Sequence, residues 1–558
     1  MTDTTAPIAP ITARLDQLFP KLTPAQIARI APHGHVRSIE RSEVLFEQGD
    51  RVVPFFVVTA GEVEIVRPSG ATELLVALLG PGQFTGEVNM ISGRRTLVRI
   101  RARQPGEVIE LDRERLLALV QTDNELSEVL TRAFILRRVE LVAQGLGDVV
   151  VVGSAHSAGT LRIKEFLTRN GHPYSYIDLD RDADVQDLLD RFHVVAADVP
   201  VVICRGEVVL RNPTNQQIAD CLGFNEAIDQ TRIRDLIIVG AGPAGLAAAV
   251  YGASEGLDVL VLETNSPGGQ AGSSSRIENY LGFPTGISGQ ELAARAYTQA
   301  QKFGTQVIIA RSARRLACDR KPYAIELDNG TRIPARVVIL AMGAQYRKLP
   351  LENLSRFEGA GVYYAATFVE AQLCGGEEVV VVGGGNSAGQ AAVFLAQTVK
   401  RVHILVRSGG LTETMSRYLI RRIEETPAIT LRPYTEIVAL EGGSHLERVR
   451  WRNKQTGQIE TSNISHVFVM MGAVPNTKWL EGCVALDVKG FIKTGPDLSQ
   501  EDLAAAHWPL ARAPHLLETS LPGVFAVGDV RAGNIKRVAS AVGEGSIAVS
   551  FVHQALHE

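Results

Sequence analysis

Three glycines and an acid near the middle of the chain have the spacing of a dinucleotide-binding site. Gly240, Gly242 and Gly245 follow the apolar stretch 236–239 and open an Ala-rich segment, and the next apolar stretch ends on Glu263. In such a strand–turn–helix–strand unit the glycines permit a tight turn, close approach of a pyrophosphate and close helix–strand packing. The N–H groups of the helix start favour the pyrophosphate. The acid is placed to accept hydrogen bonds from a ribose.

A second fingerprint lies between residues 378 and 407. Gly383 and Gly385 follow an apolar run, and the strand expected after the helix ends on Arg407 instead of an acid. An acid there accepts from a free ribose 2′-hydroxyl, whereas an arginine suits a 2′-phosphate, so the pattern favours NADPH over NADH. The residues predicted to hold NADPH are Gly383, Gly385, Asn386, Ser387, Ala388 and Arg407.

Length and composition indicate several domains of a soluble protein. The chain has 558 residues, 45% of them hydrophobic and 21% charged, with a net charge of −4. These values are typical of globular proteins and give no indication of a nucleic-acid partner. The N-terminus lacks the features of a signal peptide and no transmembrane segment is predicted, so we expect a cytoplasmic protein that does not bind membranes. The five cysteines are at least seventeen residues apart, which excludes a CxxC, a zinc knuckle and a local disulfide, and no metal site is predicted.

The N-terminal part is predicted to be rich in β-structure. Residues 22–112 alternate apolar and polar side chains in short runs separated by Gly and Pro, which indicates a β-sandwich or barrel, and helices are expected at 113–121 and 125–143.

A motif in this part resembles the phosphate-binding cassette of cyclic nucleotide-binding domains. It consists of Phe84, Gly86 and Glu87 followed by Gly93, Arg94 and Arg95. The resemblance implies a ligand site formed by Gly86 and Glu87 at a ribose and Arg95 at a phosphate, with a cyclic nucleotide as candidate effector. The alternative is a degenerate jelly roll used only for docking. No helix-turn-helix is expected after it, which argues against a transcription factor.

Residues 148–225 resemble the glutaredoxin/thioredoxin fold. The order of expected elements matches, with a helix at 184–192 and Pro200 where the family has a cis-proline. Where the family carries CxxC, this chain has Ser154 to Thr160, including His156, so thiol–disulfide exchange cannot occur at that place. Cys204 lies in an apolar strand, where we expect a buried thiol with a raised pKa.

The remaining motifs resemble the low-molecular-weight thioredoxin reductases. The stretches 266–270, 276–284, 341–344, 523–529 and 536–539 match the flavin-contacting segments of that family. The resemblance implies FAD as cofactor and a homodimer. Together with the first fingerprint it assigns to FAD the residues Gly240, Gly242, Pro243, Ala244, Gly245, Glu263, Gly269, Gln270, Asn279, Gly343, Gly528, Asp529, Arg537, Val538 and Ala539.

The redox cysteines of that family are missing. The positions of its CxxC are occupied by Ala365 and Phe368, and Cys374 lies nine residues past Ala365, too far to replace a dithiol partner. No catalytic residue is therefore identified. Hydride can pass from NADPH to FAD but cannot leave through the disulfide route of the family.

The whole sequence predicts an α/β protein with two Rossmann-like domains, preceded by a thioredoxin-like α/β domain and an N-terminal β jelly roll. The predicted domains are 1–145 (cyclic nucleotide-binding-like sensor), 146–230 (thioredoxin-like), 231–348 with 480–558 (FAD) and 349–479 (NAD(P)H). The predicted function is an FAD-dependent NADPH oxidoreductase modulated by the sensor, with an unidentified acceptor such as a quinone, a ferredoxin-like carrier or oxygen. Two alternatives stay open: a non-turnover redox sensor or regulatory interaction protein, and a thioredoxin-disulfide reductase that uses non-standard thiols.

Overall fold

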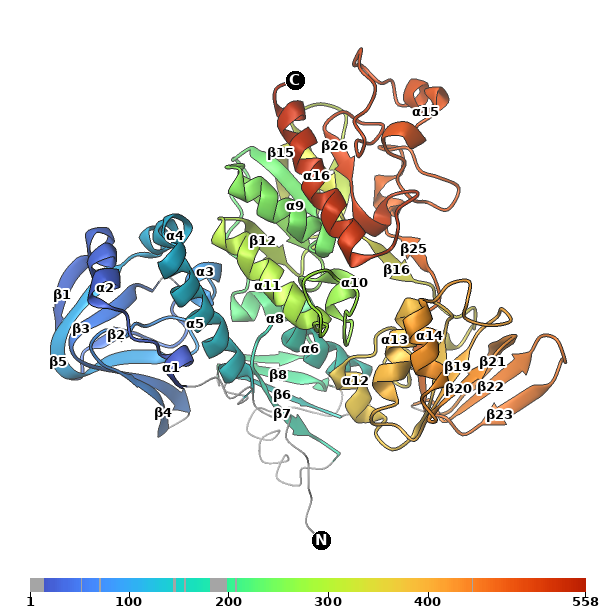
Figure 1. Cartoon of the computed structure of the whole chain (residues 1–558), viewed down its shortest axis with the longest axis horizontal. Coiled ribbons are helices and arrows are strands. Elements are labelled where there is room, and N and C mark those ends of the chain that lie inside the picture. Colours follow the sequence, from blue (N-terminus) through green and yellow to red (C-terminus); the bar gives the residue numbers. More distant parts are fainter. Residues whose placement is uncertain are drawn as a thin grey trace, which may run out of the picture.

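The computed structural model describes residues 15–558 apart from 52, 70–71, 144–146, 155–156, 181–197, 206–207 and 444. Its sheets form separate units, from the β-rich unit at the left of Figure 1 to the Rossmann-like units at the centre, top and right. The predicted α/β architecture is confirmed.

The N-terminal β unit is an antiparallel sheet flanked by short helices. Its strand order is β1-β5-β3-β4, with β2 beside β5. The rings of Phe55, Phe84 and Phe134 meet at centroid distances of 5.8–6.2 Å and form the centre of its core. The elements are α1 (Leu15–Leu18), α2 (Pro24–Ile30), η1 (Ala31–His33), β1 (His35–Ile39), β2 (Val44–Phe46), β3 (Phe55–Ser69), β4 (Thr72–Leu79), α3 (Asn89–Ser92), β5 (Arg99–Leu111), α4 (Arg113–Thr122) and α5 (Asn124–Ala143).

The thioredoxin-like unit has the strand order β7-β6-β8-β9, in which β7 is parallel to β6 and β8 is antiparallel to both of its neighbours. The Val199–Pro200 peptide bond is cis, as the resemblance predicts. The predicted helix 184–192 and His156 lie outside the described residues. The elements are β6 (Val149–Gly153), α6 (Ala158–Arg169), β7 (Ser175–Asp178), β8 (Val201–Cys204), β9 (Val208–Arg211) and α8 (Asn215–Leu222).

The first Rossmann-like unit combines two distant stretches of chain in one sheet. Its strand order is β12-β11-β10-β15-β14-β13, and β26 from near the C-terminus pairs with β15. Its elements are β10 (Arg234–Val239), α9 (Pro243–Ser254), β11 (Val259–Glu263), α10 (Gly269–Gly272), α11 (Gly289–Lys302), β12 (Gln306–Ile309), β13 (Ala313–Ala317), β14 (Tyr323–Leu327), β15 (Arg332–Leu340), η4 (Lys478–Leu480), η5 (Gly495–Asp497), α15 (Gln500–Ala505), β26 (Val524–Ala526), η6 (Gly528–Val530) and α16 (Val538–Leu556).

The second Rossmann-like unit has a parallel sheet, β17-β24-β18-β19-β20, beside an antiparallel sheet, β21-β22-β23. The chain enters and leaves this unit through β16 and β25, which pair with each other. Its elements are β16 (Ala344–Tyr346), η3 (Leu354–Arg356), β17 (Val362–Tyr363), α12 (Phe368–Leu373), β18 (Glu378–Val382), α13 (Asn386–Leu395), β19 (Arg401–Leu405), α14 (Arg417–Glu424), β20 (Ile429–Arg432), β21 (Thr435–Glu441), β22 (Arg448–Asn453), β23 (Ile459–Ser462), β24 (His466–Val469) and β25 (Ala473–Pro475).

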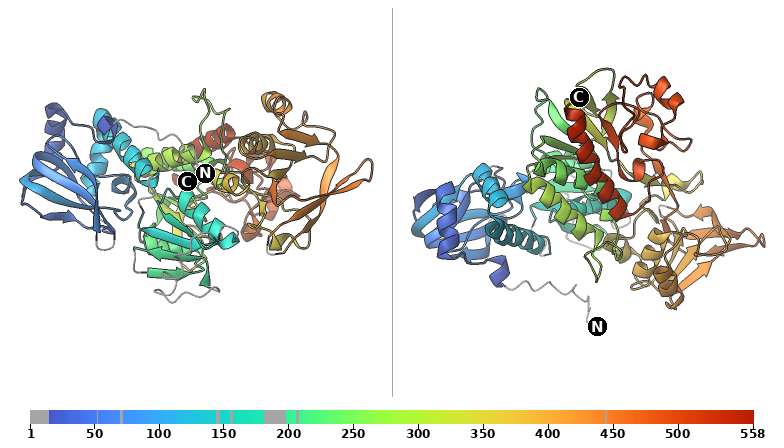
Figure 2. Two further views of the ribbon diagram at one scale, coloured as in Figure 1. Left: turned by 90° about the horizontal axis from the view of Figure 1, so that it is seen from below. Right: turned by 45° about the horizontal axis from the view of Figure 1, so that its top comes forward.

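The units are arranged around the thioredoxin-like unit. Figure 1 places it below the first Rossmann-like unit and between the β unit and the second Rossmann-like unit, and the left view of Figure 2 agrees that it lies between those two units. Within the part of the chain that the structure describes, no helix has both the length and the apolar character needed to cross a membrane.

Candidate functional site

Two glycines of the first fingerprint, Gly240 and Gly245, occupy positions that only glycine fits. Gly240 has φ of 105°, and a Cβ there would lie 2.4 Å from the carbonyl oxygen of Ala341. A Cβ on Gly245 would lie 1.9 Å from the carbonyl oxygen of Gly240. Helix α9 begins after Gly242, and no side chain of the described residues caps it. Its first N–H groups are thus free to bind an anion, which fits a dinucleotide pyrophosphate.

Glu263 is fixed at the end of β11, beside the glycine turn. It is 8% exposed, and its two carboxylate oxygens accept hydrogen bonds from the backbone N–H groups of Ala241 (2.8 Å) and Asn265 (2.9 Å). These bonds hold the acid next to the fingerprint, where the ribose of a bound dinucleotide is expected.

The segment 265–284, which we call the flavin loop, contacts the same turn. The Gly268 N–H donates to the Ala241 carbonyl at 2.7 Å, and a Cβ on Gly269 would lie 3.0 Å from the Gly242 Cα. Gln270 donates through Nε2 to the carbonyl of Ala344 at the start of β16. Gly343 has φ of 64°, and Asn279 is exposed. The loop therefore joins the fingerprint to the connection between the two Rossmann-like units.

The C-terminal motif reaches the fingerprint from the other side. A Cβ on Gly528 would lie 2.9 Å from the Cβ of Ala244, and a Cβ on Gly545 of α16 would lie 2.1 Å from its carbonyl oxygen. Asp529 is half-buried, and burial raises the pKa of its carboxyl, with Lys536 opposing this and Glu544 adding to it. No described side chain caps α16 at its N-cap residue, Arg537; Val538 and Ala539 form its first turn. These features fit a second contact region for the same nucleotide.

The second fingerprint has the same backbone geometry. Gly383 has φ of 143°, and a Cβ there would lie 2.4 Å from the carbonyl oxygen of Met470. Gly385 precedes α13, whose N-terminus has no side-chain cap from the described chain. Asn386 accepts a hydrogen bond from the Ser416 N–H at 2.7 Å. Ala388 is fully buried, and Arg407 lies exposed just beyond β19. These residues fit a phosphate-bearing nucleotide.

Tyr346 of β16 brings the two predicted nucleotide sites together. Burial raises the pKa of its hydroxyl; a hydrogen bond with Ser387 opposes the shift and the charge of Asp529 adds to it. A second link is the ion pair of Arg422 on α14 with Glu278 in the flavin loop, at 2.8 Å. The second fingerprint therefore lies close to the segments that resemble flavin-contacting motifs.

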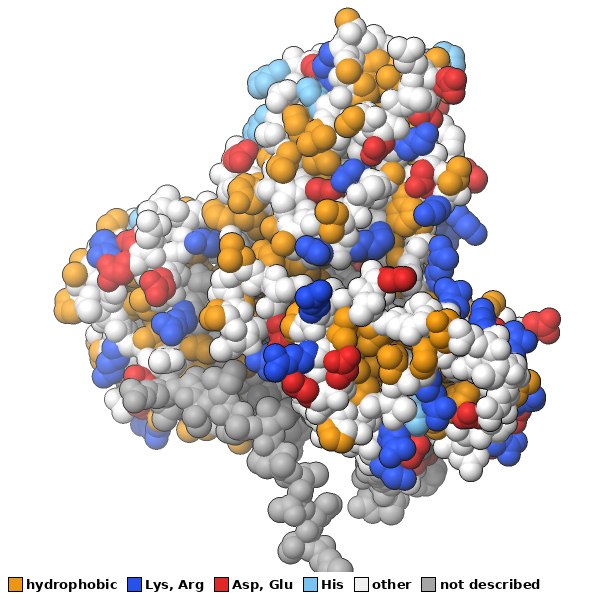
Figure 3. All heavy atoms as spheres, turned by 45° about the vertical axis from the view of Figure 1, so that its right-hand side comes forward, with side chains coloured by type: hydrophobic (Ala, Val, Ile, Leu, Met, Phe, Trp, Pro, Cys, Tyr) orange, Lys and Arg blue, Asp and Glu red, His pale blue; other side chains and the backbone are white. Residues whose placement is uncertain are grey.

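This boundary is rich in positive charge. Figure 3 shows Lys and Arg side chains gathered where the upper and lower right parts of the molecule meet. Exposed basic residues in or near the motifs on the two sides include Arg347, Arg407, Arg417, Lys536 and Arg537. Positive charge of this kind favours phosphate-bearing ligands.

The segment that replaces the family's CxxC is packed against the thioredoxin-like unit. Ala365 precedes α12 and Phe368 begins it. A Cβ on Gly359 would lie 2.7 Å from the Cβ of Ala158, the first residue of α6. Leu161 of α6 belongs to the same apolar cluster as Tyr363 and Ala366, and Figure 1 shows α6 and α12 side by side.

Helix α6 also reaches the flavin loop. At its C-terminal end Arg169 donates to the Gly269 carbonyl at 2.7 Å, and Asn170 donates to the Asn265 carbonyl at 3.3 Å. One helix of the thioredoxin-like unit therefore contacts both Rossmann-like units.

The predicted ligand residues of the β unit, Gly86, Glu87 and Arg95, each contact a different part of the protein. Glu87 is 6% exposed and pairs with Arg138 on α5 at 3.4 Å. The Gly86 carbonyl accepts from Arg137 at 2.7 Å. Arg95 donates to the Gly49 carbonyl at 2.9 Å. No contact among the described residues joins Glu87 to Arg95.

Arg94 ties the same motif to the rest of the protein. Its guanidinium donates to the Asn170 carbonyl at 2.9 Å and lies 4.4 Å from the ring centroid of Phe224. Arg138 adds a 2.9 Å hydrogen bond to the Gly171 carbonyl. The cassette-like motif thus also serves as a docking surface.

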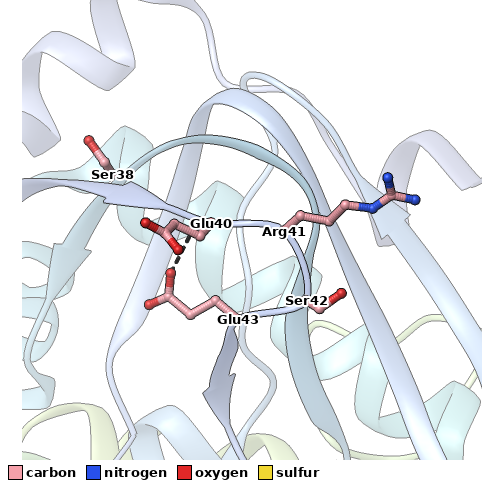
Figure 4. A pocket seen from close by; sticks show the side chains of 5 residues that line it. All are labelled: Ser38, Glu40, Arg41, Ser42 and Glu43. Carbon is pink, nitrogen blue, oxygen red and sulfur yellow. Dashed lines mark hydrogen bonds between the residues drawn. The ribbon is translucent and has the colours of Figure 1, made fainter.

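A hollow in the β unit lies at the turn between β1 and β2 and is lined by Ser38, Glu40, Arg41, Ser42 and Glu43. Figure 4 shows Arg41 pointing away from the two acids, whose backbone and side chain are joined by the 2.9 Å hydrogen bond from the Glu40 N–H to Glu43. None of the predicted site residues lines it.

Two cysteine contacts were missed from the sequence. Cys318 and Cys483 form a disulfide with a Cα–Cα distance of 6.2 Å and a sequence separation of 165, linking the two halves of the first Rossmann-like unit. Cys204 and Cys221 are neighbouring free thiols in the thioredoxin-like unit. The spacing of the cysteines excludes only disulfides between residues that are close in sequence. No sequence motif indicates either of these two contacts. The described residues contain no cluster of metal-ligating side chains.

Comparison with known proteins agrees with this geometry. Residues 234–545 match the family model described as pyridine nucleotide-disulphide oxidoreductase, and residues 36–123 match a cyclic nucleotide-binding domain. The chain is 32% identical over 325 residues to the thioredoxin reductase of Ureaplasma parvum, covering 58% of this chain and 96% of that one. It is 30% identical over 331 residues to that of Bacillus subtilis, covering 59% and 97%.

Solved structures give the same result. The thioredoxin reductase of Lactococcus lactis in a conformation named FR matches with a TM-score of 0.52 and 25% identity, covering 58% of this chain and 99% of that one. The enzyme of T. acidophilum matches with a TM-score of 0.52 and 28% identity, covering 59% and 100%.

Fold and site together define a flavoprotein oxidoreductase with two dinucleotide-binding units. The family match covers more than half of the chain, and the chain belongs to the pyridine nucleotide-disulphide oxidoreductase family, with thioredoxin reductase homologues. It is accordingly an FAD- and NAD(P)H-dependent oxidoreductase that also carries an N-terminal cyclic nucleotide-binding domain.

Proposed function

We propose that the protein oxidises NADPH through a bound FAD and passes the electrons to an acceptor without a dithiol relay, with the N-terminal β unit modulating this activity. The observation that carries the proposal is the segment at Ala365 and Phe368, which has no thiol at either relay position and is packed against α6. A dithiol relay requires two sulfurs in contact. The reduced flavin would then pass its electrons directly to an acceptor.

The chain's own residues support this assignment. Gly242 and Arg537 precede two helices whose first N–H groups favour phosphate, and Glu263 and Asp529 are placed for hydroxyl groups of the nucleotide. When bound, FAD supplies a two-electron centre for reduced nicotinamide and a second acceptor. The exposed Arg407 favours the 2′-phosphate of NADPH. A homodimer, as the resemblance implies, is part of the proposal.

The test is anaerobic titration of the purified holoprotein with NADPH while the flavin spectrum is recorded. We expect bleaching, followed by recovery when a quinone, a ferredoxin-like carrier or oxygen is added. Steady-state NADPH oxidation with the same acceptors, with and without cyclic nucleotides, measures the proposed modulation. Absence of turnover with every acceptor would contradict the proposal.

The same titration includes thioredoxin and an aromatic disulfide as acceptors. Their reduction at rates comparable to the small acceptors would favour the disulfide reductase alternative. Cys374 is an unsuitable substitute thiol, because it is fully buried and burial raises its pKa to about 12.

A second candidate is a redox sensor without turnover. It is favoured by the hydrogen bond from Arg169 to Gly269, which connects the thioredoxin-like unit to the flavin loop. A flavin that NADPH does not bleach, together with a protein partner whose binding depends on reduction state, would support the sensor over the enzyme.

A further inference from the structure

The thioredoxin-like unit contains a thiol pair away from the place where its fold family carries one. Cys204 ends β8 and Cys221 lies on α8, and the two thiols are close enough to shift each other's ionisation. Cys204 is fully buried in the core of the unit, whereas Cys221 packs against the same core and is partly exposed. The pair therefore has one sulfur within reach of solvent and a second sulfur behind it.

Three arginines surround this pair. Arg205 directly follows Cys204, and Arg51 and Arg95 extend from the β unit to Gly223, two residues after Cys221. A Cβ on Gly223 would lie 2.7 Å from both Arg51 Nη2 and Arg95 Nε. The Nε atoms of all three arginines are buried without a hydrogen-bond partner in the described chain.

One acid that interacts with this cluster is already engaged in another contact. Asp148 interacts electrostatically with Arg95 and Cys221, but its carboxylate is hydrogen-bonded to His172 at 3.1 Å, with both side chains buried. The charges that act on Arg95 are those of Arg51 and Arg205, which disfavour its charged form, and those of Cys221 and Asp148, which favour it. A thiolate at Cys221 would therefore stabilise this guanidinium.

Electrostatics polarise the two thiols in opposite directions. The interaction with the Cys204 thiol, together with the charges of Arg205 and Arg95, lowers the pKa of Cys221 to about 7, although burial and Asp148 oppose this. The same interaction, with burial, raises the pKa of Cys204. A thiolate in an electropositive, partly exposed place beside a second thiol has the properties of a redox-sensing cysteine.

We propose that Cys221 and Cys204 form a hydroperoxide-sensitive dithiol, in which Cys221 is the attacking and Cys204 the resolving thiol. The Cys221 thiolate attacks the outer oxygen of the hydroperoxide, so that an S–O bond forms, the O–O bond breaks and the leaving alkoxide or hydroxide takes a proton. The Cys204 sulfur then attacks the Cys221 sulfur, so that the S–S bond forms, the S–O bond breaks, and the departing hydroxide takes the Cys204 proton and leaves as water. The two thiols lose two electrons and the hydroperoxide gains them.

The position of the pair gives this oxidation a structural consequence. Disulfide formation removes the negative charge of Cys221 from Arg51 and Arg95, which belong to the β unit, and from Arg205. Oxidation therefore changes the electrostatics at the boundary of the β unit and the thioredoxin-like unit, independently of flavin turnover.

The test uses the full-length protein, reduced, freed of reductant and treated with hydrogen peroxide. The protein is then denatured, its remaining thiols are blocked with an alkylating reagent, and it is digested with trypsin without reduction. Arg205 and Arg211 separate the two cysteines into different tryptic peptides, so a linked pair is diagnostic in mass spectrometry. We expect a Cys204–Cys221 cross-link while Cys374 stays alkylatable. Thiol loss at Cys374 without that cross-link would overturn the proposal.

Variants assign the two roles. In Cys204→Ala we expect a sulfenic acid at Cys221 that dimedone traps, and Cys374→Ala serves as the thiol control that leaves the cross-link unchanged. At pH 7, Arg95→Gln should slow cross-linking about fivefold, because a one-unit rise in the pKa of the attacking thiol lowers its thiolate fraction from about one half to about one tenth. Arg113→Gln is the matched control, because Arg113 lies at the same boundary but pairs with Glu226 at 3.2 Å. Equal cross-linking rates in the two arginine variants would overturn the proposed role of the arginine cluster. The cross-link in the wild-type protein tests the proposal even if a variant fails to fold.

Discussion

The two fingerprints share one backbone geometry but are enclosed to different extents. The first is contacted by three other segments of the chain: the flavin loop at Gly269, the residue after β15 at Ala341 and the C-terminal motif at Gly528. The second is contacted by Met470 of its own unit and by Thr414, which donates to the Gly384 carbonyl at 2.7 Å. The first site therefore lies inside the first Rossmann-like unit, which is split in sequence. The second lies at the exposed edge of the second Rossmann-like unit, which is inserted between the two halves of the first.

This difference fits the expected roles of the two nucleotides. A cofactor that stays bound gains from contacts with both halves of a unit, because its release would require those halves to separate. A cosubstrate that must enter and leave in each turnover needs an open site. Substitutions at equivalent glycines should therefore have different consequences.

The largest effect is expected for Gly245→Ala, because the added Cβ would lie 1.9 Å from the Gly240 carbonyl oxygen. We expect the purified variant to contain no FAD and to unfold at a lower temperature, as measured by flavin absorbance and calorimetry. Gly543→Ala in α16 is the control, since nothing lies within 4 Å of its Cβ. It should keep FAD and gain at most about 1 kcal/mol of stability. A Gly245→Ala protein with full flavin content would contradict this description.

A smaller effect is expected for Gly383→Ala, where φ of 143° and the Met470 carbonyl at 2.4 Å exclude a side chain. FAD content should be normal, and flavin reduction by NADPH should slow about tenfold or more, the effect of the roughly 1–3 kcal/mol that such backbone strain costs. Dithionite should still reduce the flavin. Gly410→Ala, which meets nothing within 4 Å, is the control. Loss of FAD from Gly383→Ala would show that the two sites are not separable.

Arg407→Ala should act only on the choice of nucleotide. If the exposed Arg407 binds the 2′-phosphate, its loss removes a charge-assisted hydrogen bond of about 1.5–3 kcal/mol, and the KM for NADPH should rise about tenfold. The KM for NADH should stay unchanged. Arg401→Ala, at the other end of β19, is the control. Equal changes for both nucleotides would remove the assignment of NADPH.

The smallest effect is expected for Glu278→Gln, which breaks the ion pair of Arg422 with the flavin loop. Because such partly exposed pairs contribute about 0.2–1 kcal/mol, we expect a change of a few-fold at most in the rate of flavin reduction by NADPH, with FAD content unchanged. Arg421→Gln, whose partner Glu425 is on the same helix, should leave stopped-flow rates unaltered. A change of a hundredfold in Glu278→Gln would mean that this pair controls the position of the NADPH unit.

Much of the fold could be predicted from the sequence because its signals are local. The runs around Gly240 and Gly383 specify strand, turn and helix within about thirty residues, the typical length of a βαβ unit, and the structure has these elements in place. The cis bond before Pro200 and the buried Cys204 were also predicted and are confirmed. The ligands of the predicted site residues remain predictions.

Contacts between distant segments could not be predicted in the same way. The pairing of Cys318 with Cys483, the docking of Ala158 on Gly359 and the approach of Arg95 to Gly223 each join residues that share no local pattern. They depend on how whole units pack, which is decided by apolar surface and shape summed over many residues.

The sequence by itself therefore determined which chemistry the chain can and cannot carry: two nucleotide fingerprints, and no cysteine at the relay positions Ala365 and Phe368. Only the tertiary structure decided where the remaining thiols meet and which charges surround them. Glycine spacing acts through the local backbone, whereas the environment of Cys221 is built from Arg95 of one unit and Arg205 of another, and electrostatics depend on distance in space instead of distance along the chain.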